Sequence, residues 1–228
     1  MNDTEALRRR WDALHGQPRY LPVFPNESVV RWQRRSFPDA EANRPSVVDI
    51  GCGGGRHSLA MARDGIQVTA CDLSPVGVAA VASRARQEKL RINTYAAAMQ
   101  QLPFAANQFD GLLCFGVLNY VPVSVIEEAI SEFARILKPG GRFHIMARGD
   151  KDWRIRFARM TAAHEYELAG LEDTPAAAEE GLRLTLFDRP LIDRLFDRFE
   201  KLEVDWFISG QGGGLFNNSD WHISGQNP

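Results

Sequence analysis

The order of apolar and polar residues along this chain predicts strands that alternate with helices. Short apolar runs typical of buried parallel strands are followed by amphipathic stretches, and glycine or proline marks most of the boundaries between them. In the first two thirds of the chain we expect strands at residues 46–50, 67–71, 93–97, 109–115 and 143–147.

Helical spacing of apolar residues fills the intervals between these strands. Ser74 and Pro75 suit the N-cap and the first position of one helix, and Ser124 with Glu127 forms a capping box at the start of another. We therefore expect helices at residues 57–65, 75–89, 124–137 and 190–199.

Two further strands are expected near the end of the chain, at residues 202–208 and 221–224, with a Gly/Asn loop between them. Helices that alternate with strands indicate a parallel sheet covered on both faces. The expected fold is therefore α/β, with a doubly wound, mostly parallel seven-stranded sheet and an antiparallel hairpin at its edge.

Two segments lie outside this alternation. Residues 1–45 combine arginines with prolines and aromatic residues, and residues 148–188 are polar with several arginines close together. We expect one domain in which both segments cover a site. Its parts are a cap segment at 1–45, a core at 46–147, an insertion at 148–188, and a C-terminal helix with edge strands at 189–228.

Composition narrows the class of protein. The 228 residues are 44% hydrophobic and 25% charged, which is enough to build one substantial core. The net charge of −2 lacks the basic excess of a protein that grips nucleic acid through phosphates, so we expect no nucleic-acid partner. The first ten residues have no apolar run typical of a signal peptide, and residues 111–126 are too short and interrupted for a membrane span.

The three cysteines, Cys52, Cys71 and Cys114, are odd in number and widely spaced. This pattern favours reduced, buried thiols over disulfides or a zinc site. Together with the missing signal peptide it predicts a cytoplasmic protein without membrane contact. The pattern says nothing about the oligomeric state.

A glycine-rich turn follows the first expected strand. Gly51, Gly53 and Gly55 let the backbone bend tightly and let a ligand approach without a Cβ in the way. Asp72 ends the next strand, about 20 residues after Gly51, where an acid holds a pair of ribose hydroxyls in nucleotide-binding folds. A nucleoside-containing cofactor is therefore expected.

Arg56 decides between two classes of cofactor, because it stands where a dinucleotide fingerprint beginning at Gly51 needs its last glycine. The chain instead resembles the class I S-adenosylmethionine-dependent methyltransferases, whose first motif has an acid two residues before a G-x-G-x-G turn. The resemblance spans residues 46–147 and includes Asp49 with the three glycines, Asp72, the LPF run at 102–104 before Phe109-Asp110, and the ILKPGGRF run at 136–143.

This resemblance implies roles for individual residues. The turn would line the methionine part of the cofactor, with Asp49 supporting the turn or the amino group, and Asp72 would hold the ribose. Many relatives have an acid where this chain has Ala98, which leaves Gln100 or Gln101 to contact the adenine. The cofactor residues implied are Asp49, Gly51, Cys52, Gly53, Gly55, Asp72, Leu73, Met99, Gln100, Phe115 and Gly116.

Other candidates come from residue chemistry alone. Arg31 suits a carboxylate of the cofactor, with a solvated helix arginine as the alternative. His57, Asn119 and Tyr120 are candidates for catalysis, with packing or loop structure as the alternative for each. Candidate substrate contacts are Tyr20, Trp32, Tyr120, Arg148 and Arg154, with core packing or a solvated charged face as the alternative.

The function predicted is methyl transfer from S-adenosylmethionine to a small molecule by in-line displacement. No metal is expected, because the fourth strand ends in Phe115-Gly116 with no acid directly after it. Neither an N-P-P-Y or D-P-P-Y tetrapeptide nor a Pro-Cys nucleophile for nucleic-acid bases is present. Two alternatives stay open: an NAD-dependent oxidoreductase, and a cofactor-binding interaction module without catalysis.

Overall fold

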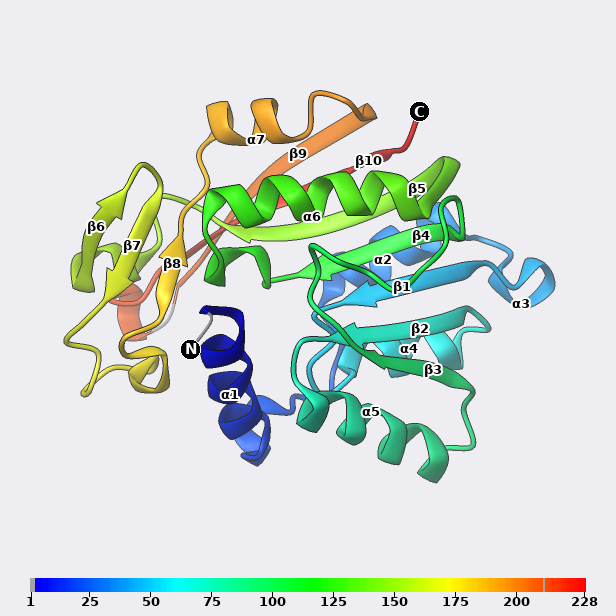
Figure 1. The fold of residues 1–228 in the computed structure, drawn as a ribbon, viewed down its shortest axis with the longest axis horizontal. Helices are drawn as coiled ribbons and strands as arrows, with labels where there is room; N and C mark the ends of the chain where they lie inside the picture. The colour runs from blue at the N-terminus through cyan, green and yellow to red at the C-terminus, as the bar shows by residue number, and fades with distance from the viewer. Residues whose placement is uncertain (1–2, 211) are drawn as a thin grey trace.

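The computed structural model describes residues 3–210 and 212–228 and has a seven-stranded sheet at its centre (Figure 1). The strand order is β3-β2-β1-β4-β5-β10-β9; β1 to β5 are parallel, and β10 is antiparallel to both of its neighbours. This arrangement confirms the expected doubly wound sheet with an edge hairpin. The strands are β1 (Ser46–Ile50), β2 (Gln67–Asp72), β3 (Ile92–Ala96), β4 (Phe109–Phe115), β5 (Leu137–Arg148), β9 (Glu200–Ser209) and β10 (Asn218–Gln226).

Helices cover both faces of the sheet (Figure 1). On one face lie α6 (Val123–Ile136) and α7 (Arg189–Leu195), and on the other lie α2 (Glu27–Ser36), α4 (Arg56–Arg63) and α5 (Pro75–Gln87). The first helix, α1 (Asp3–His15), lies at the edge of the sheet where the parallel strands end, and α3 (Ala40–Asn43) precedes β1. No helix of residues 3–210 and 212–228 has the length and apolar character to cross a membrane.

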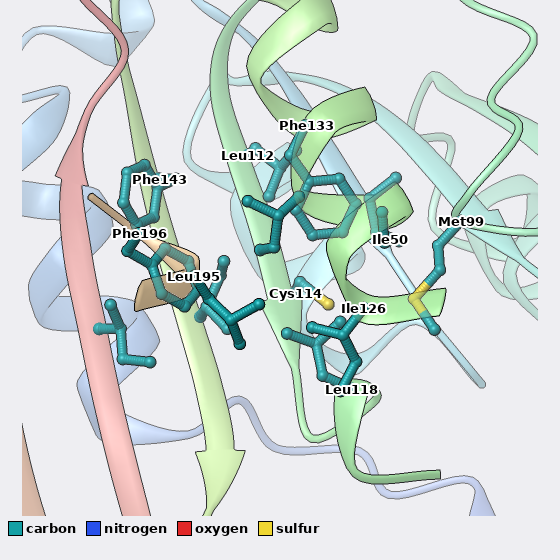
Figure 2. Packing of buried hydrophobic residues seen from close by; sticks show 14 of the residues in the cluster. Ile50, Met99, Leu112, Cys114, Leu118, Ile126, Phe133, Phe143, Leu195 and Phe196 are labelled. Carbon is teal, nitrogen blue, oxygen red and sulfur yellow. The ribbon is translucent and has the colours of Figure 1, made fainter. Parts of the chain in front are cut away.

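The main core lies between the sheet and the helices α6 and α7. Figure 2 shows Phe133 of α6 over Leu112 of β4, and Phe143 of β5 beside Phe196, which follows α7. These four side chains are at most 1% exposed. Because burying a large apolar side chain contributes about 1.5–3 kcal/mol, this layer holds the parallel strands, and with them their carboxyl ends, in place.

The insertion after β5 contains a second, three-stranded antiparallel sheet that its polar sequence did not predict. Its strands are β6 (Ala158–Ala162), β7 (Glu165–Leu168) and β8 (Arg183–Thr185). They are short, so their alternation extends over too few residues to stand out. A small core beneath them includes Trp153, Leu168, Leu171, Leu184 and Leu186.

The expected capping box at the start of α6 is wrong. Pro122 is the N-cap, and the amide of Val123 donates to Glu165 Oε1 of β7 at 2.9 Å. Glu127 instead forms an ion pair with Arg194 of α7. A carboxylate from the insertion thus supplies the cap, which ties the small sheet to the core.

Candidate cofactor and acceptor site

The turn between β1 and α4 has three glycines with positive φ, at Gly51 (69°), Gly53 (50°) and Gly55 (81°). The amides of Gly51 and Cys52 both donate to the carbonyl of Cys71 in β2, at 2.7 and 3.1 Å. A Cβ on Gly51 would stand 2.1 Å from Cγ2 of Val117. Glycine is therefore required there both by the backbone angle and by the packing.

Asp72 ends β2 beside this turn and is 7% exposed. One carboxylate oxygen accepts from the amide of Gly53 and the other from the amide of Ser74, both at 2.8 Å. Burial raises the pKa of the Asp72 carboxyl, while these two hydrogen bonds act in the opposite direction. Asp72 thereby fixes the glycine turn, and its two carboxylate oxygens keep lone pairs that can accept hydrogen bonds from a ligand.

A cavity of about 890 Å³ lies at the carboxyl ends of β1, β2 and β4, where ligands bind in open α/β sheets. Such a volume is at the upper end of the range for small-molecule sites, about 300–1,000 Å³. Nine of the residues expected to bind a cofactor line it together: Gly51, Cys52, Gly53, Asp72, Leu73, Met99, Gln100, Phe115 and Gly116.

Helix α1 and the insertion cover this cavity. Leu7, Trp11 and His15, spaced four residues apart along α1, all line it. Arg10 reaches across to the insertion and donates to the carbonyls of Ala178 and Glu180, at 3.0 and 2.7 Å. Sequence reasoning missed these residues, although their four-residue spacing is a signal for one helical face.

A scan of family models matches residues 47–141 to the methyltransferase domain. Residues 47–141 form a methyltransferase domain. The matched segment contains the glycine turn, Asp72 and the ends of β3 and β4, which form one wall of the cavity.

The methyltransferase domain is similar to curated ubiquinone biosynthesis O-methyltransferases. It is 35% identical over 96 residues to that of Coxiella burnetii, covering 42% of this chain and 40% of the relative. It is 37% identical over 102 residues to that of Xanthomonas oryzae pv. oryzae, covering 43% and 41%. The chain thus spans about two fifths of the length of the curated relatives it matches.

Solved structures of methyltransferases resemble this chain over nearly its whole length. The 1,6-didemethyltoxoflavin-N1-methyltransferase of Burkholderia thailandensis has a TM-score of 0.65 at 20% identity, covering 98% of this chain and 88% of that one. The magnesium protoporphyrin IX methyltransferase of Synechocystis has a TM-score of 0.67 at 14% identity, covering 100% and 98%. At this identity the likeness concerns the fold.

Asp49 and Gly55 of the methyltransferase domain do not line the cavity. The Asp49 carboxylate is 1% exposed and accepts from the hydroxyl of Ser58 at 2.6 Å. Burial raises the pKa of Asp49 to about 7. This position suits support of the turn rather than contact with an amino group.

Arg31 and Trp32 lie away from the cavity, against the expectation from sequence. Because α2 packs on the face of the sheet, both residues border a separate hollow of about 230 Å³ beside β5, β9 and β10. The Arg31 guanidinium stands 3.6 Å from Glu27, and its side chain is 63% exposed. Trp32 is buried and stacks on His144 with ring centroids 5.8 Å apart.

Arg148, Arg154 and Asn119 also lie outside the cavity, in a buried polar network rather than on a substrate surface. Both arginines bind the fully buried carboxylate of Asp152, at 2.8 and 3.0 Å. The side-chain oxygen of Asn119 accepts from the amide of Arg148 at 2.8 Å. Buried charges need such partners, so these residues hold the insertion on the sheet.

The remaining candidates, Tyr20, Tyr120 and His57, do line the cavity of the methyltransferase domain. Burial raises the pKa of Tyr120 to about 12, so its hydroxyl stays protonated at neutral pH, and its ring meets Trp11 edge-on at 5.0 Å. Burial lowers the pKa of His57 to about 3, so its imidazole is neutral. Ala98, Met99 and Gln100 line the end of the cavity beyond β3.

Proposed function

We propose that this chain transfers a methyl group from S-adenosylmethionine to a small, largely apolar molecule. The observation that carries the proposal is one continuous cavity that joins the glycine turn and Asp72 to an apolar end beneath α1. That end is lined by Leu7, Trp11, Val121, Val125 and Leu182. The relatives named for quinone, toxoflavin and porphyrin methylation support an acceptor of this kind.

The residues of the cavity fit S-adenosylmethionine. The glycine turn allows close approach of the methionine part, and the Asp72 carboxylate has lone pairs left for ribose hydroxyls. Leu73 and Met99 offer apolar surface for the adenine, and Gln100 offers an amide for its polar edge. When bound, the cofactor supplies a methyl group on a positively charged sulfur that a nucleophile can attack in line.

The contribution of the protein to such a transfer is positioning and closure. Phe115 and Gly116, at the end of β4, line the cavity and are proposed to border the transferred methyl group. Helix α1, held to the insertion through Arg10, covers part of the cavity and is proposed to limit the access of water to the bound ligands. Orientation in a dry site supplies much of the rate enhancement for such displacements, and Tyr20 and Tyr120 are proposed to orient the acceptor.

The cytoplasm is the proposed location. Cys52, Cys71 and Cys114 are free and buried, which agrees with a reducing compartment.

Calorimetric titration with S-adenosylmethionine, S-adenosylhomocysteine and NAD tests the proposal. We expect micromolar dissociation constants for the first two and no heat with NAD. An acceptor screen with methyl-labelled S-adenosylmethionine then separates an enzyme from a binding module without catalysis. Failure of both adenosyl ligands to bind would overturn the proposal, and binding of NAD instead would favour hydride transfer.

A further inference from the structure

Strand β9 (Glu200–Ser209) is the outermost strand of the seven-stranded sheet, beside β10 (Figure 1). In the part of the chain that the structure describes, β9 pairs with β10 alone, so the backbone N–H and C=O groups along its outer side lack a partner strand. Eight of its ten residues are exposed. Such an edge can accept a further strand, and natural proteins protect long edges with charge, proline or bulges.

The second half of β9 lacks this protection. Trp206, Phe207 and Ile208 follow one another and are 42%, 44% and 55% exposed. The charged residues of the strand all precede this run: Glu200, Lys201, Glu203 and Asp205. Trp206 is held in place, because its ring stacks on Trp221 with centroids 6.0 Å apart and its Nε1 donates to Ser219 Oγ at 2.8 Å. A fixed, half-exposed tryptophan in an apolar run is typical of residues that anchor protein interfaces.

The regular part of β9 extends from Glu203 to Ser209, where each residue pairs in turn with β10, and Trp206 is its central residue. A bulge separates it from the start of the strand, where Lys201 has a positive φ of 50°. Two copies of the regular part can pair antiparallel about a two-fold axis normal to the sheet, which leaves each side chain on the side of the sheet that it already occupies. When all seven residues of this part are paired, Trp206 lies opposite Trp206 of the second copy.

Charge selects this register over its neighbours. Shifting the pairing toward the start of the strand places Asp205 opposite its own copy, or Glu203 opposite Asp205, and like charges directly opposite one another destabilise a sheet. A shift toward the end of the strand leaves fewer residues paired. In the register centred on Trp206, each acid instead faces an uncharged residue and Val204 faces Ile208. The strand is therefore complementary to a second copy of itself.

We propose that two copies of this chain form a two-fold dimer in which their β9 strands pair, centred on Trp206, and join both sheets into one. The side chains of Val204, Trp206 and Ile208 would pack across the junction on the side of the sheet that α6 and α7 cover, where Val204 already contacts the main core. A closed pair leaves neither β9 edge open to further chains. No residue of β9 lines the cavity, so this dimer does not depend on the proposed function.

Sedimentation equilibrium tests the dimer. At micromolar concentration the wild type is expected at about twice the 25.5 kDa mass of one chain. Ile208→Lys places a charge opposite Val204, twice per dimer because of the symmetry, and should weaken the dimer by about 100-fold or more. Met160→Lys is the matched control, because Met160 is 62% exposed on β6 and lies outside the interface. Thermal melts show that both variants are folded.

A monomeric wild type would overturn the proposal, even where a different protein occupies the β9 edge. An Ile208→Lys variant that dimerises as well as the wild type, or a wild type that assembles beyond the dimer, would overturn it too.

Cysteine cross-linking tests the register. The double variant with Val204→Cys and Ile208→Cys should form a covalent dimer with oxidised glutathione, because directly opposite residues of paired strands place their Cβ atoms near disulfide distance. Each single variant sets its cysteine opposite an apolar residue and should stay uncross-linked. The native cysteines are buried and do not compete. No cross-link in the double variant, or an equal yield in a single variant, would overturn the register centred on Trp206.

Discussion

The carboxylate of Asp72 accepts a hydrogen bond from the amide of Gly53, with 2.8 Å between Oδ2 and N. This bond joins the end of β2 to the glycine turn that follows β1, so one acid both shapes the turn and faces the cavity. Shape and ligand contact are therefore coupled at this position. A change at Asp72 should act on cofactor affinity through both.

Asp72→Ala is expected to weaken S-adenosylhomocysteine by about 10- to 100-fold, because a charge-assisted hydrogen bond to the ribose is lost and the turn is released. Asp72→Asn should bind nearly as poorly. Its two side-chain atoms face the amides of Gly53 and Ser74, and the NH₂ group would meet one of these donors. Calorimetry measures both, with exposed Asp197→Asn as control. Full affinity of Asp72→Asn would contradict this argument.

Gly51→Ala is expected to destabilise the fold by about 2–4 kcal/mol, from left-handed backbone strain and overpacking against Val117. Gly213 has a similar φ of 67° but open space around a Cβ, so Gly213→Ala isolates the backbone term. Adding Val117→Ala to Gly51→Ala should recover the packing part only. Urea denaturation measures all four proteins, and equal losses for the two glycine variants would show that the contact with Val117 carries no cost.

Asp152→Asn is expected to cost about 3–5 kcal/mol of stability, because it leaves the charges of Arg148 and Arg154 buried without their shared partner. Exposed Asp150→Asn, two residues away, is the control and should change little. Because this network lies outside the cavity, the melting temperature should fall while the affinity of the remaining folded protein for S-adenosylhomocysteine stays near that of the wild type. A weakened affinity without loss of stability would restore the arginines to the substrate site.

The grouping of the glycine turn with Asp72 on one wall of the cavity could be predicted from the sequence, because local backbone rules determine it. A strand that enters a glycine turn and an acid at the next strand end place Gly51, Gly53 and Asp72 together whatever surrounds them. The other side of the cavity comes from α1 and the insertion, whose placement depends on contacts distant in sequence, such as that of Arg10 in α1 with Glu180 in the insertion. The residue types along α1 and the insertion do not reveal where these two segments lie on the core.

The residues misplaced from sequence share a cause. Four side chains have chemistry that suits a ligand but also suits another role: Arg31, Trp32, Arg148 and Arg154. Arg31 instead stands beside Glu27 on an exposed helix face, Trp32 packs on His144, and the other two arginines form buried ion pairs. For Arg148 a signal was present, since Asp152 follows four residues later. For Trp32 the deciding fact is which face of the sheet α2 covers, and that is a tertiary property.

Stability should fall as the solution is acidified through the range from about pH 6.5 to 4. Burial lowers the pKa of His57 and His144 from 6.5 to about 3 and that of His222 to about 4, so in this range the unfolded chain binds protons that the folded chain excludes. Asp49 opposes them, because its raised pKa of about 7 lets the folded chain hold a proton that the unfolded chain releases above about pH 4. Asp72 and Asp220 oppose the histidines as well, because the pKa of each carboxyl is raised. Asp110 and Glu132, whose pKa values are lowered, act with the histidines at the acid end of this range. The groups that favour stability at higher pH outnumber those that oppose it, which leaves a net gain of stability with rising pH.

Two variants separate these contributions in urea denaturation across that range. His144→Gln should flatten the pH dependence by up to about 1.4 kcal/mol per pH unit, the slope for one proton. Asp49→Asn, which keeps an acceptor for Ser58, should steepen the pH dependence by removing one of the opposing groups. A wild-type stability that stays constant from pH 6.5 to 4, or an Asp49→Asn profile flatter than that of the wild type, would contradict the assignment of charge states. Neutral histidines packed around Phe115 would then not be the source of acid sensitivity.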